Sequence, residues 1–359
     1  MRKPKIKVAV LYNEPDPEMY IKTDDEEVKQ PEFQTYFEVD KTTPMEEFDY
    51  IAEKLENVGF EAYTLNIKDS LESMLTNLKN AKPDVIFNFV EIYKENSRLE
   101  MNIAGLYELL GIAYTGAPSL ALANCQNKIF AKRLLRSGGI RIPPFFIVSK
   151  KSTRYTHRLK YPLLVKPAYE DASVGIENES IVNNGKELRK RIEHVLQDFQ
   201  QPALVEEFIE GRELNVAVMG DKRLRVLPIS EIDFTAMPDH LHNIVSYQAK
   251  WDPHHESYHK TIPKCPAPLP KKIEQRAKEI AFKAFKVMGC RDYARVDIRL
   301  AKDNKLYVLE VNPNPDITEG AGFMRSAEHA GMTYAQTLKR IVRYALGRSV
   351  TKKPVKVSA

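Results

Sequence analysis

Hydrophobic residues in the first third of the chain follow two alternating periods. Short runs rich in apolar and β-branched residues at 6–12 and 84–90 have the length of strands. Between them, 46–57 and 70–80 repeat their apolar residues every three or four positions, which is typical of helices that bury one face. Strands that alternate with helices in this way build a parallel sheet wrapped by helices. We therefore expect residues 1–116 to form an α/β domain.

A second part of the chain has shorter elements and a different rhythm. Gly138-Gly139 and Pro143-Pro144 mark a boundary, after a long helix predicted at 119–136. The short strands that follow, with one helical pattern among them, predict a small α+β lobe, and the polar segment 232–270 predicts a loop. The further elements that we expect are strands at 161–166, 203–209, 213–219, 223–229, 292–300 and 305–311, and helices at 186–197, 271–288 and 334–346.

Length and composition indicate a folded protein of several lobes. The distribution of charge does not indicate binding to nucleic acid. The chain has 359 residues, of which 43% are hydrophobic and 29% are charged, as in globular proteins. The net charge of +5 comes from charges of both signs along the chain, with a basic excess in the tail 351–359. The polar segment 14–43 has no convincing periodicity, and we expect a long loop there.

Cysteine content and the lengths of the apolar runs predict a cytoplasmic protein. Cys125, Cys265 and Cys290 have no paired spacing, so we expect neither a disulfide framework nor a structural zinc site. The apolar run that follows the basic start ends at Tyr12 and is too short for a signal peptide or a membrane span. We expect no membrane partner.

Two neighbouring strands near the C-terminus carry the strongest chemical pattern. A period of two places Arg295 and Asp297 on one face of the first strand, and Glu310 and Asn312 on one face of the second. Carboxylate and amide oxygens suit Mg²⁺, which keeps waters and bridges nucleotide phosphates. The alternative is a solvated hairpin with incidental charges, but a glutamate within an apolar strand is costly without a function. We therefore expect a metal site that ATP completes.

Other segments carry weaker signals, which their local context leaves open. Lys166 ends an apolar strand and can reach a phosphate, although a strand-end lysine that extends into solvent is the commoner case. Lys128 by itself would be an ordinary surface lysine. The run 206–209 could bind the edge of an adenine, and Glu213 could bind a ribose. The same residues fit a plain strand and turn equally well.

These motifs follow one another in a specific order. The order is Gly111-Ile-Ala-Tyr-Thr-Gly116, Lys128, Lys166-Pro167, Leu204-Val-Glu-Glu-Phe-Ile-Glu-Gly-Arg-Glu213, Tyr247-Gln-Ala-Lys250, Cys265-Pro-Ala267, Arg295-Val-Asp297 and Leu309-Glu-Val-Asn312. It resembles the D-alanine–D-alanine ligase family of the ATP-grasp superfamily, from about residue 85 to the end of the chain.

The resemblance implies an α/β protein with the ATP-grasp fold. Residues 1–116 would be an N-terminal parallel-sheet (pre-ATP-grasp) domain, and 117–210 a small α+β central lobe. A C-terminal α+β lobe at 211–350 would carry the metal site, and 351–359 would be a basic tail.

Roles for individual residues follow from the same resemblance. It implies ATP and two divalent cations, Mg²⁺ or Mn²⁺, as cofactors. The residues that it places around ATP are Lys128 and Lys166 at the phosphates, Glu206, Glu207, Phe208 and Ile209 along the adenine, Glu213 at the ribose and Leu309 under the base. Those that it places at the cations are Asp297, Glu310 and Asn312. Lys250 and Arg295 would stabilise the transferred phosphoryl group and the tetrahedral intermediate.

The match weakens where the family binds its amino acids. A Gly-Gly-x-Ser-x-Glu segment is replaced by Asn13-Glu-Pro-Asp-Pro-Glu18, and a His-Gly-x-x-Gly-Glu segment by Asn88-Phe-Val-Glu-Ile-Tyr93. Where the family has small hydroxylated residues that hold the acceptor carboxylate, this chain has Gly320-Ala-Gly322. The positions that we assign to the substrate pocket are Ser173 in the phosphate-covering loop, Trp251 in place of a tyrosine, and Asp316 in place of an oxyanion-hole glycine.

The sequence therefore predicts an ADP-forming carbon–nitrogen ligase that works through an acyl phosphate, with an altered amino-acid pocket. The runner-up is the standard D-alanine–D-alanine ligase of cell-wall synthesis. A non-catalytic ATP-binding sensor is a third reading, against which the presence of both Arg295 and Lys250 argues. The expected partners are small amino-acid or peptide substrates. The oligomeric state is left open, although enzymes of this shape are commonly homodimers.

Overall fold

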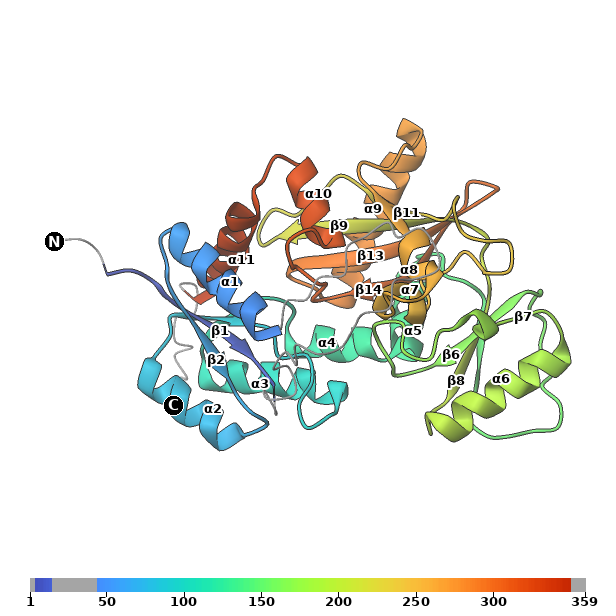
Figure 1. Ribbon diagram of the computed structural model, residues 1–359, viewed down its shortest axis with the longest axis horizontal. Helices are drawn as coiled ribbons and strands as arrows, with labels where there is room; N and C mark the ends of the chain where they lie inside the picture. The colour runs from blue at the N-terminus through green and yellow to red at the C-terminus, as the bar shows by residue number, and fades with distance from the viewer. Residues whose placement is uncertain (1–3, 15–43, 350–359) are drawn as a thin grey trace, which may run out of the picture.

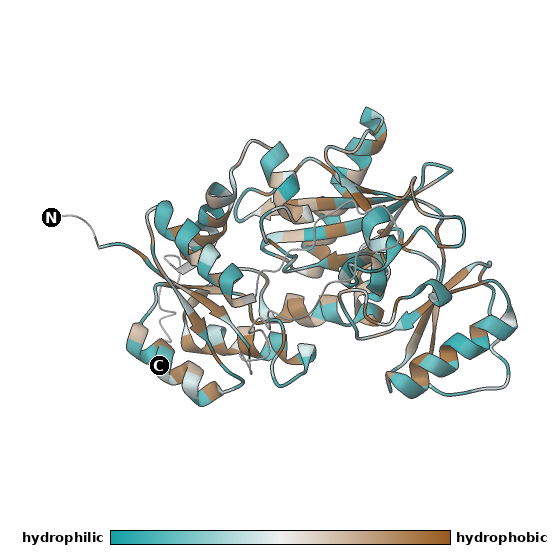
Figure 2. Cartoon of the chain, in the orientation of Figure 1, coloured by the Kyte–Doolittle hydropathy of each residue, from teal (hydrophilic) through white to brown (hydrophobic). Residues whose placement is uncertain are grey.

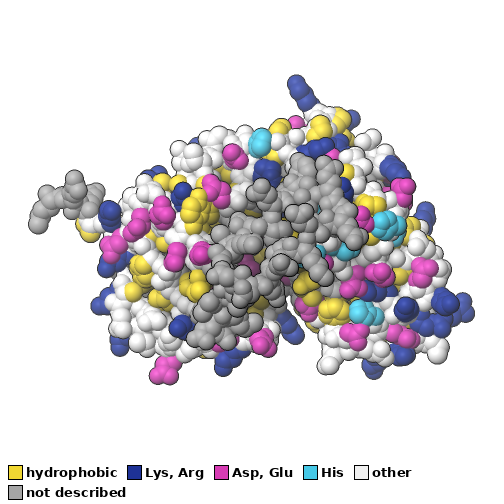
Figure 3. Space-filling model, in the orientation of Figure 1, with side chains coloured by type: hydrophobic (Ala, Val, Ile, Leu, Met, Phe, Trp, Pro, Cys, Tyr) yellow, Lys and Arg dark blue, Asp and Glu magenta, His cyan; other side chains and the backbone are white. Residues whose placement is uncertain are grey.

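The computed structural model describes residues 4–14 and 44–349 and divides them among three sheets (Figure 1). Most of the loop predicted at 14–43 and the basic tail at 351–359 lie outside the described residues. None of the helices in the described ranges is long and apolar enough to cross a membrane. Over the face in Figure 3, acidic and basic side chains of the described residues are interspersed.

The N-terminal sheet is parallel, as the alternating pattern predicts, and its strand order is β2-β1-β3-β4. Helices cover both of its faces, and residues 8–11 in its first strand are accordingly fully buried. Its elements are β1 (Lys7–Tyr12), β2 (Glu61–Asn66), β3 (Val85–Asn88), β4 (Ala113–Tyr114), α1 (Pro44–Asn57), α2 (Leu71–Ala81) and α3 (Glu100–Leu110).

The central sheet is antiparallel, with the order β5-β8-β6-β7, and one long helix packs on it. That helix buries Leu188, Ile192 and Val195, which lie on one face because they are spaced by four and three residues. Figure 2 shows the corresponding hydrophobic stripe on an otherwise hydrophilic helix. The elements are β5 (Phe145–Val148), β6 (Leu163–Pro167), β7 (Ile181–Val182), β8 (Ala203–Glu207) and α6 (Gly185–Asp198).

The C-terminal sheet has the order β12-β11-β9-β13-β14, with β10 paired to β9. One face packs on α9 through a shared apolar core that includes Ala281, Phe285, Val296 and Ile298. The elements are β9 (Gly211–Gly220), β10 (Arg225–Val226), β11 (Ser230–Asp233), β12 (Ile262–Lys264), β13 (Asp292–Ala301), β14 (Leu306–Asn312), α9 (Lys271–Met288), α10 (Gly322–His329) and α11 (Tyr334–Ser349).

The single helix predicted at 119–136 is wrong, because the structure has two helices there. These are α4 (Ser119–Gln126) and α5 (Lys128–Ser137), separated by Asn127 in an extended conformation. The Asn127 side chain accepts hydrogen bonds from the backbone N–H groups of residues 129 and 130, so it caps α5. The break makes Lys128 the first residue of α5, and α5 packs against α9 and β14 of the C-terminal sheet.

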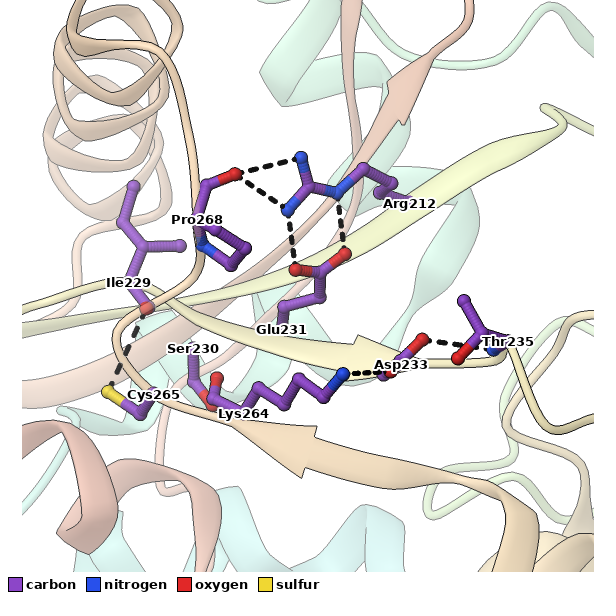
Figure 4. Close-up of polar contacts among 9 residues, drawn as sticks. All are labelled: Arg212, Ile229, Ser230, Glu231, Asp233, Thr235, Lys264, Cys265 and Pro268. Atoms are coloured by element: carbon purple, nitrogen blue, oxygen red, sulfur yellow. Dashed lines mark hydrogen bonds and ion pairs between the residues drawn. The ribbon is translucent and has the colours of Figure 1, made fainter.

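The segment 232–270, predicted as a loop, contains two short helices and an edge strand. Helices α7 (Tyr247–Trp251) and α8 (Glu256–Lys260) lie between β11 and β12. Two ion pairs hold the base of this excursion in Figure 4, Arg212 with Glu231 and Lys264 with Asp233. The excursion is therefore attached to the sheet at both of its ends.

Candidate active site

The two strands predicted to carry the metal ligands are neighbours, as expected. Arg295 pairs with Asn312, and Asp297 pairs with Glu310. The next pair is Ile298 with Val308, which leaves Leu309 as an extra residue in β14. Such a bulge changes the direction of the side chains around it. As a result Leu309 and Glu310 are both half-buried, between the buried residues 308 and 311.

Asp297 is buried and receives hydrogen bonds on both carboxylate oxygens. Arg295 donates from Nε to Oδ1 and from Nη2 to Oδ2, each at 2.8 Å. The side-chain amides of Asn215 and Asn312 donate to the same carboxylate, also at 2.8 Å. This network brings Arg295, Asp297 and Asn312 together, as the sequence predicts. Asn215 is an additional member, whose side chain the sequence pattern alone does not distinguish from that of any other strand residue.

Glu310 has a different partner, which comes from α5. Lys128 Nζ lies 3.2 Å from Glu310 Oε2. The positive charge of Lys128 holds the pKa of Glu310 far below its ordinary value, against the opposing effect of burial. Because Lys128 begins α5, the break at Asn127 places the first predicted phosphate ligand directly over the predicted metal-binding strand.

The oxygen atoms on this face fit a divalent cation that also binds phosphate. Asp297, Glu310 and Asn312 offer two carboxylates and one amide from adjacent positions of a strand pair. Residues 4–14 and 44–349 contain no group of three His, Cys, Asp or Glu side chains arranged to hold a metal ion by themselves. The donor set suits Mg²⁺ rather than zinc, since Mg²⁺ takes only one or two carboxylates and completes its shell with water and phosphate oxygens.

A second charged group is buried in the central sheet. Lys166 Nζ lies 2.8 Å from Glu206 Oε1, and Lys132 of α5 forms an ion pair with Glu206 Oε2. Burial opposes ionisation of Glu206, but the two ammonium groups outweigh it and lower the pKa of Glu206 to about 2. Sequence reasoning missed Lys132. The available signal was its spacing of four residues from Lys128, which places both on one face of a helix.

The segment predicted to line the adenine begins at the end of β8 and continues into the connection to β9. Phe208 and Ile209 are half-buried, and Glu207 accepts a hydrogen bond from the backbone N–H of Lys160 at 2.9 Å. Glu213, predicted at the ribose, is buried and accepts a hydrogen bond from Arg299 Nη2 at 2.7 Å. Burial raises the pKa of Glu213 in spite of the positive charge of Arg299.

Three of the predicted residues form a separate group at the phosphate-covering loop. Trp251 Nε1 donates to the backbone oxygen of Ala172 at 2.9 Å, and Ser173 Oγ donates to that of Val245 at 2.9 Å. Lys250 is exposed and lies over the Trp251 ring, 4.9 Å from its centroid. The structure thus joins the loop at 171–173 to α7, but it gives Lys250 no hydrogen bond to Arg295 or Asp297 among the described residues.

The loop that follows β14 connects the C-terminal sheet to the N-terminal domain. Asn314 accepts a hydrogen bond from the backbone N–H of Ala117 and donates to Glu100 Oε1 at 3.0 Å. Gln126 donates to the other oxygen of Glu100, also at 3.0 Å. Asp316 in this loop accepts hydrogen bonds from the backbone N–H and hydroxyl of Thr318. Asp316 therefore lies in a loop that Asn314 attaches to the N-terminal domain.

Several known proteins are similar to this chain over much of its length. Residues 134–343 match the family model described as D-ala D-ala ligase C-terminus. The chain is 32% identical over 299 residues to the D-alanine–D-alanine ligase of Methylobacterium radiotolerans, which covers 82% of this chain and 90% of the relative. It is also 30% identical over 262 residues to an uncharacterized protein, y4sG, of Sinorhizobium fredii, covering 73% of this chain and 74% of that protein.

A solved structure has a similar fold. It is the D-alanine–D-alanine ligase from Bacillus anthracis complexed with ATP, with a TM-score of 0.69 and 22% identity, covering 97% of this chain and 100% of that one. At this level of identity the similarity concerns the fold alone.

Proposed function

Because the chain belongs to the D-alanine–D-alanine ligase family of ADP-forming carbon–nitrogen ligases, we propose that it joins a carboxylate to an amine in an amino-acid pocket that differs from the standard one. The observation that carries the proposal is the convergence of Arg295, Asp297, Glu310 and Lys128 at one end of β13 and β14. Phosphoryl transfer needs mainly positioning and neutralisation of charge, and this group supplies both.

In the proposed reaction, a carboxylate oxygen attacks the γ-phosphorus of ATP, and ADP leaves. The nitrogen of the amine then attacks the acyl carbon, phosphate leaves with its bridging oxygen, and the amine gives up a proton. Lys128 and Lys166 bind the phosphates, and Arg295 stabilises the charge that develops on the transferred group. Two Mg²⁺ or Mn²⁺ ions held by Asp297, Glu310 and Asn312 would supply charge neutralisation at the phosphates. Lys250 would reach the transferred phosphoryl group from α7 and help to stabilise its charge.

Support for an altered amino-acid pocket comes from the group around α7. The hydroxyl of Ser173 and the indole N–H of Trp251 both donate to backbone carbonyls, so neither donor is free for a substrate. Asp316 adds a carboxylate at a position where the family has a glycine. Standard D-alanine–D-alanine ligation is the second candidate, which the names of curated relatives favour.

The experiment that tests the proposal measures release of ADP and phosphate with Mg²⁺ and a panel of D- and L-amino acids, short peptides and hydroxy acids. Mass spectrometry identifies the products. In parallel, hydroxylamine traps any acyl phosphate as a hydroxamate and so identifies the carboxylate independently of the amine. An amide other than D-alanyl-D-alanine would support the proposal, and D-alanyl-D-alanine would support the second candidate. Binding of ATP without hydroxamate or amide from any member would contradict both.

A further inference from the structure

One position on the buried face of α6 holds an arginine. The apolar side of this helix contains Leu188, Ile192 and Val195. A spacing of three residues after Leu188 puts Arg191 on the same side, where it is only 7% exposed. Its Nε atom has no hydrogen-bond partner in the part of the chain that the structure describes, which adds to the cost of burial. Since an apolar residue would fill this position at a lower cost, the arginine needs an explanation other than the packing of α6.

The Arg191 side chain holds the end of the loop at 168–176, which follows β6. Its Nη1 donates to Glu177 Oε2 at 2.7 Å, and its Nη2 donates to the backbone oxygen of Gly175 at 2.9 Å. Ser180 Oγ donates to the same backbone oxygen at 3.4 Å and accepts a hydrogen bond from the N–H of Glu177 at 2.9 Å. Arg191 therefore attaches the end of this loop to α6.

The backbone of the loop at 168–176 is strained, and two of its donors have no protein partner. Ala172 and Ser173 have φ values of 51° and 65°, in the left-handed region that is unfavourable for both residues. The backbone N–H groups of Ser173 and Gly175 find no acceptor within residues 4–14 and 44–349. Gly175 is buried, and a buried N–H without a partner is rare in a folded protein. An anion can accept hydrogen bonds from such N–H groups.

The position of this loop favours a phosphate of the proposed nucleotide as the anion. A Cβ atom on Gly175 would lie 2.6 Å from Pro167 Cγ, so Gly175 contacts the end of β6 that carries Lys166. The backbone N–H of Lys128 donates to the backbone oxygen of Ala168 at 3.1 Å. The loop is thus in contact with the segments of both lysines to which we assign phosphate binding.

We propose that Arg191 is a positioning residue for the triphosphate, which holds the loop at 168–176 in the conformation that binds phosphate. This inference rests on the proposed binding of ATP. Trp251 and Val245 hold the same loop from the side of α7, whereas Arg191 holds it from the side of α6. Without Arg191 the strained backbone would relax, and ATP binding would have to order the loop again, which lowers the affinity.

The test compares the binding of ATP with that of adenosine, which has the same base and ribose but no phosphate. Calorimetry with Mg²⁺ gives the dissociation constant of ATP, and competition with ATP gives that of adenosine, for the wild type, Arg191→Met and Arg191→Lys. We expect Arg191→Met to weaken ATP binding by about tenfold and to change adenosine binding by less than about twofold, because only the phosphates meet the loop. Arg191→Lys keeps a charged donor and should recover part of the loss.

Arg189→Met, at an exposed position of the same helix, is the matched control and should bind both ligands as the wild type does. Melting curves show whether each variant folds. Glu177→Gln, which removes the charge of the partner of Arg191, replaces Arg191→Met if the latter does not fold. Unchanged ATP binding in the folded variant, or an equal loss for ATP and adenosine, would overturn the inference and leave the proposed function intact. A wild-type chain that binds no ATP would overturn both.

Discussion

Asp297 and Glu310 are opposite each other across β13 and β14, yet their surroundings differ. The hydrogen bonds to Asp297 come from its own sheet, whereas the partner of Glu310 comes from α5. Asp297 is therefore oriented before any ligand binds. Glu310 would exchange its contact with Lys128 when phosphate and cation bind between them. At the scale of single residues, Glu310 is thus the more direct test of the cation site.

Replacing Glu310 with glutamine should lower the rate of ATP-dependent ligation by about 100-fold or more, because the change removes one charged oxygen donor. The Mg²⁺ concentration for half-maximal activity should rise. Measurement of ADP release over a range of Mg²⁺ concentrations checks both effects. Glu56→Gln, at an exposed position in α1, is the matched control. An unchanged rate and Mg²⁺ dependence would contradict the assignment of Glu310 as a cation ligand.

At the scale of single residues, the sequence could predict which side chains lie together only where they are close along the chain. Arg295, Asp297, Glu310 and Asn312 belong to one hairpin, so a period of two was enough to bring them together. Lys132 could not be recognised in this way. Its partner Glu206 is far along the chain, and only the packing of α5 makes an ordinary-looking helical lysine a buried one.

At the scale of secondary-structure elements, the connection between α7 and the loop at 171–173 is the most specific feature of this chain. Trp251 joins the two through its indole N–H, and Ser173 bonds to Val245, which lies just before α7. Both segments surround the region where we expect the amino acids. Their relative position should therefore affect the choice of substrate more than the binding of ATP.

Trp251→Phe keeps an aromatic ring but removes the hydrogen bond to Ala172, which is worth ~1 kcal/mol. We expect the ratio of kcat/KM values between two amino-acid substrates to change by about fivefold, while the KM for ATP changes by less than about twofold. Tyr155→Phe, in the central lobe, removes a hydroxyl that accepts a hydrogen bond from the backbone N–H of Ser152, and it serves as a comparison. A larger effect on ATP than on the amino acids would show that Trp251 is misplaced in our proposal.

Prediction of elements from the sequence succeeded where apolar periodicity was strong and failed where one polar residue decided the outcome. The strands β1 and β3 of the parallel N-terminal sheet and the pair β13 and β14 were anticipated. The break at Asn127 was not, because the apolar pattern continues across it. The bulge at Leu309 was also missed, although the shift of buried positions from Leu306 and Val308 to Val311 is a sign of it.

For the whole molecule, Glu100 connects lobes that are distant in sequence. It is buried and lies 214 residues before its partner Asn314. Burial raises the pKa of Glu100 to about 8, with a further contribution from the negative charge of Glu91. A carboxyl group with a raised pKa binds its proton more tightly in the folded state. Its contribution to stability is therefore complete at low pH and is lost as the pH rises to about 8.

We accordingly expect the free energy of unfolding to fall by on the order of 1–3 kcal/mol between pH 6 and pH 9 through this group. Glu100→Gln mimics the protonated form and should remove this part of the pH dependence. Denaturant unfolding at several pH values measures the effect, with Glu56→Gln as the control for loss of one carboxylate. If the slope with pH is the same in Glu100→Gln and in the wild type, Glu100 is not the group responsible.

The position of α5 also has a consequence for how the parts of the molecule are held together. The resemblance places α5 in the central lobe, but α5 packs with the C-terminal sheet, while Glu206 belongs to the central sheet. The ion pair of Lys132 with Glu206 therefore connects the central sheet to a helix of the C-terminal core. Because both side chains are buried, we expect this connection to depend only weakly on ionic strength.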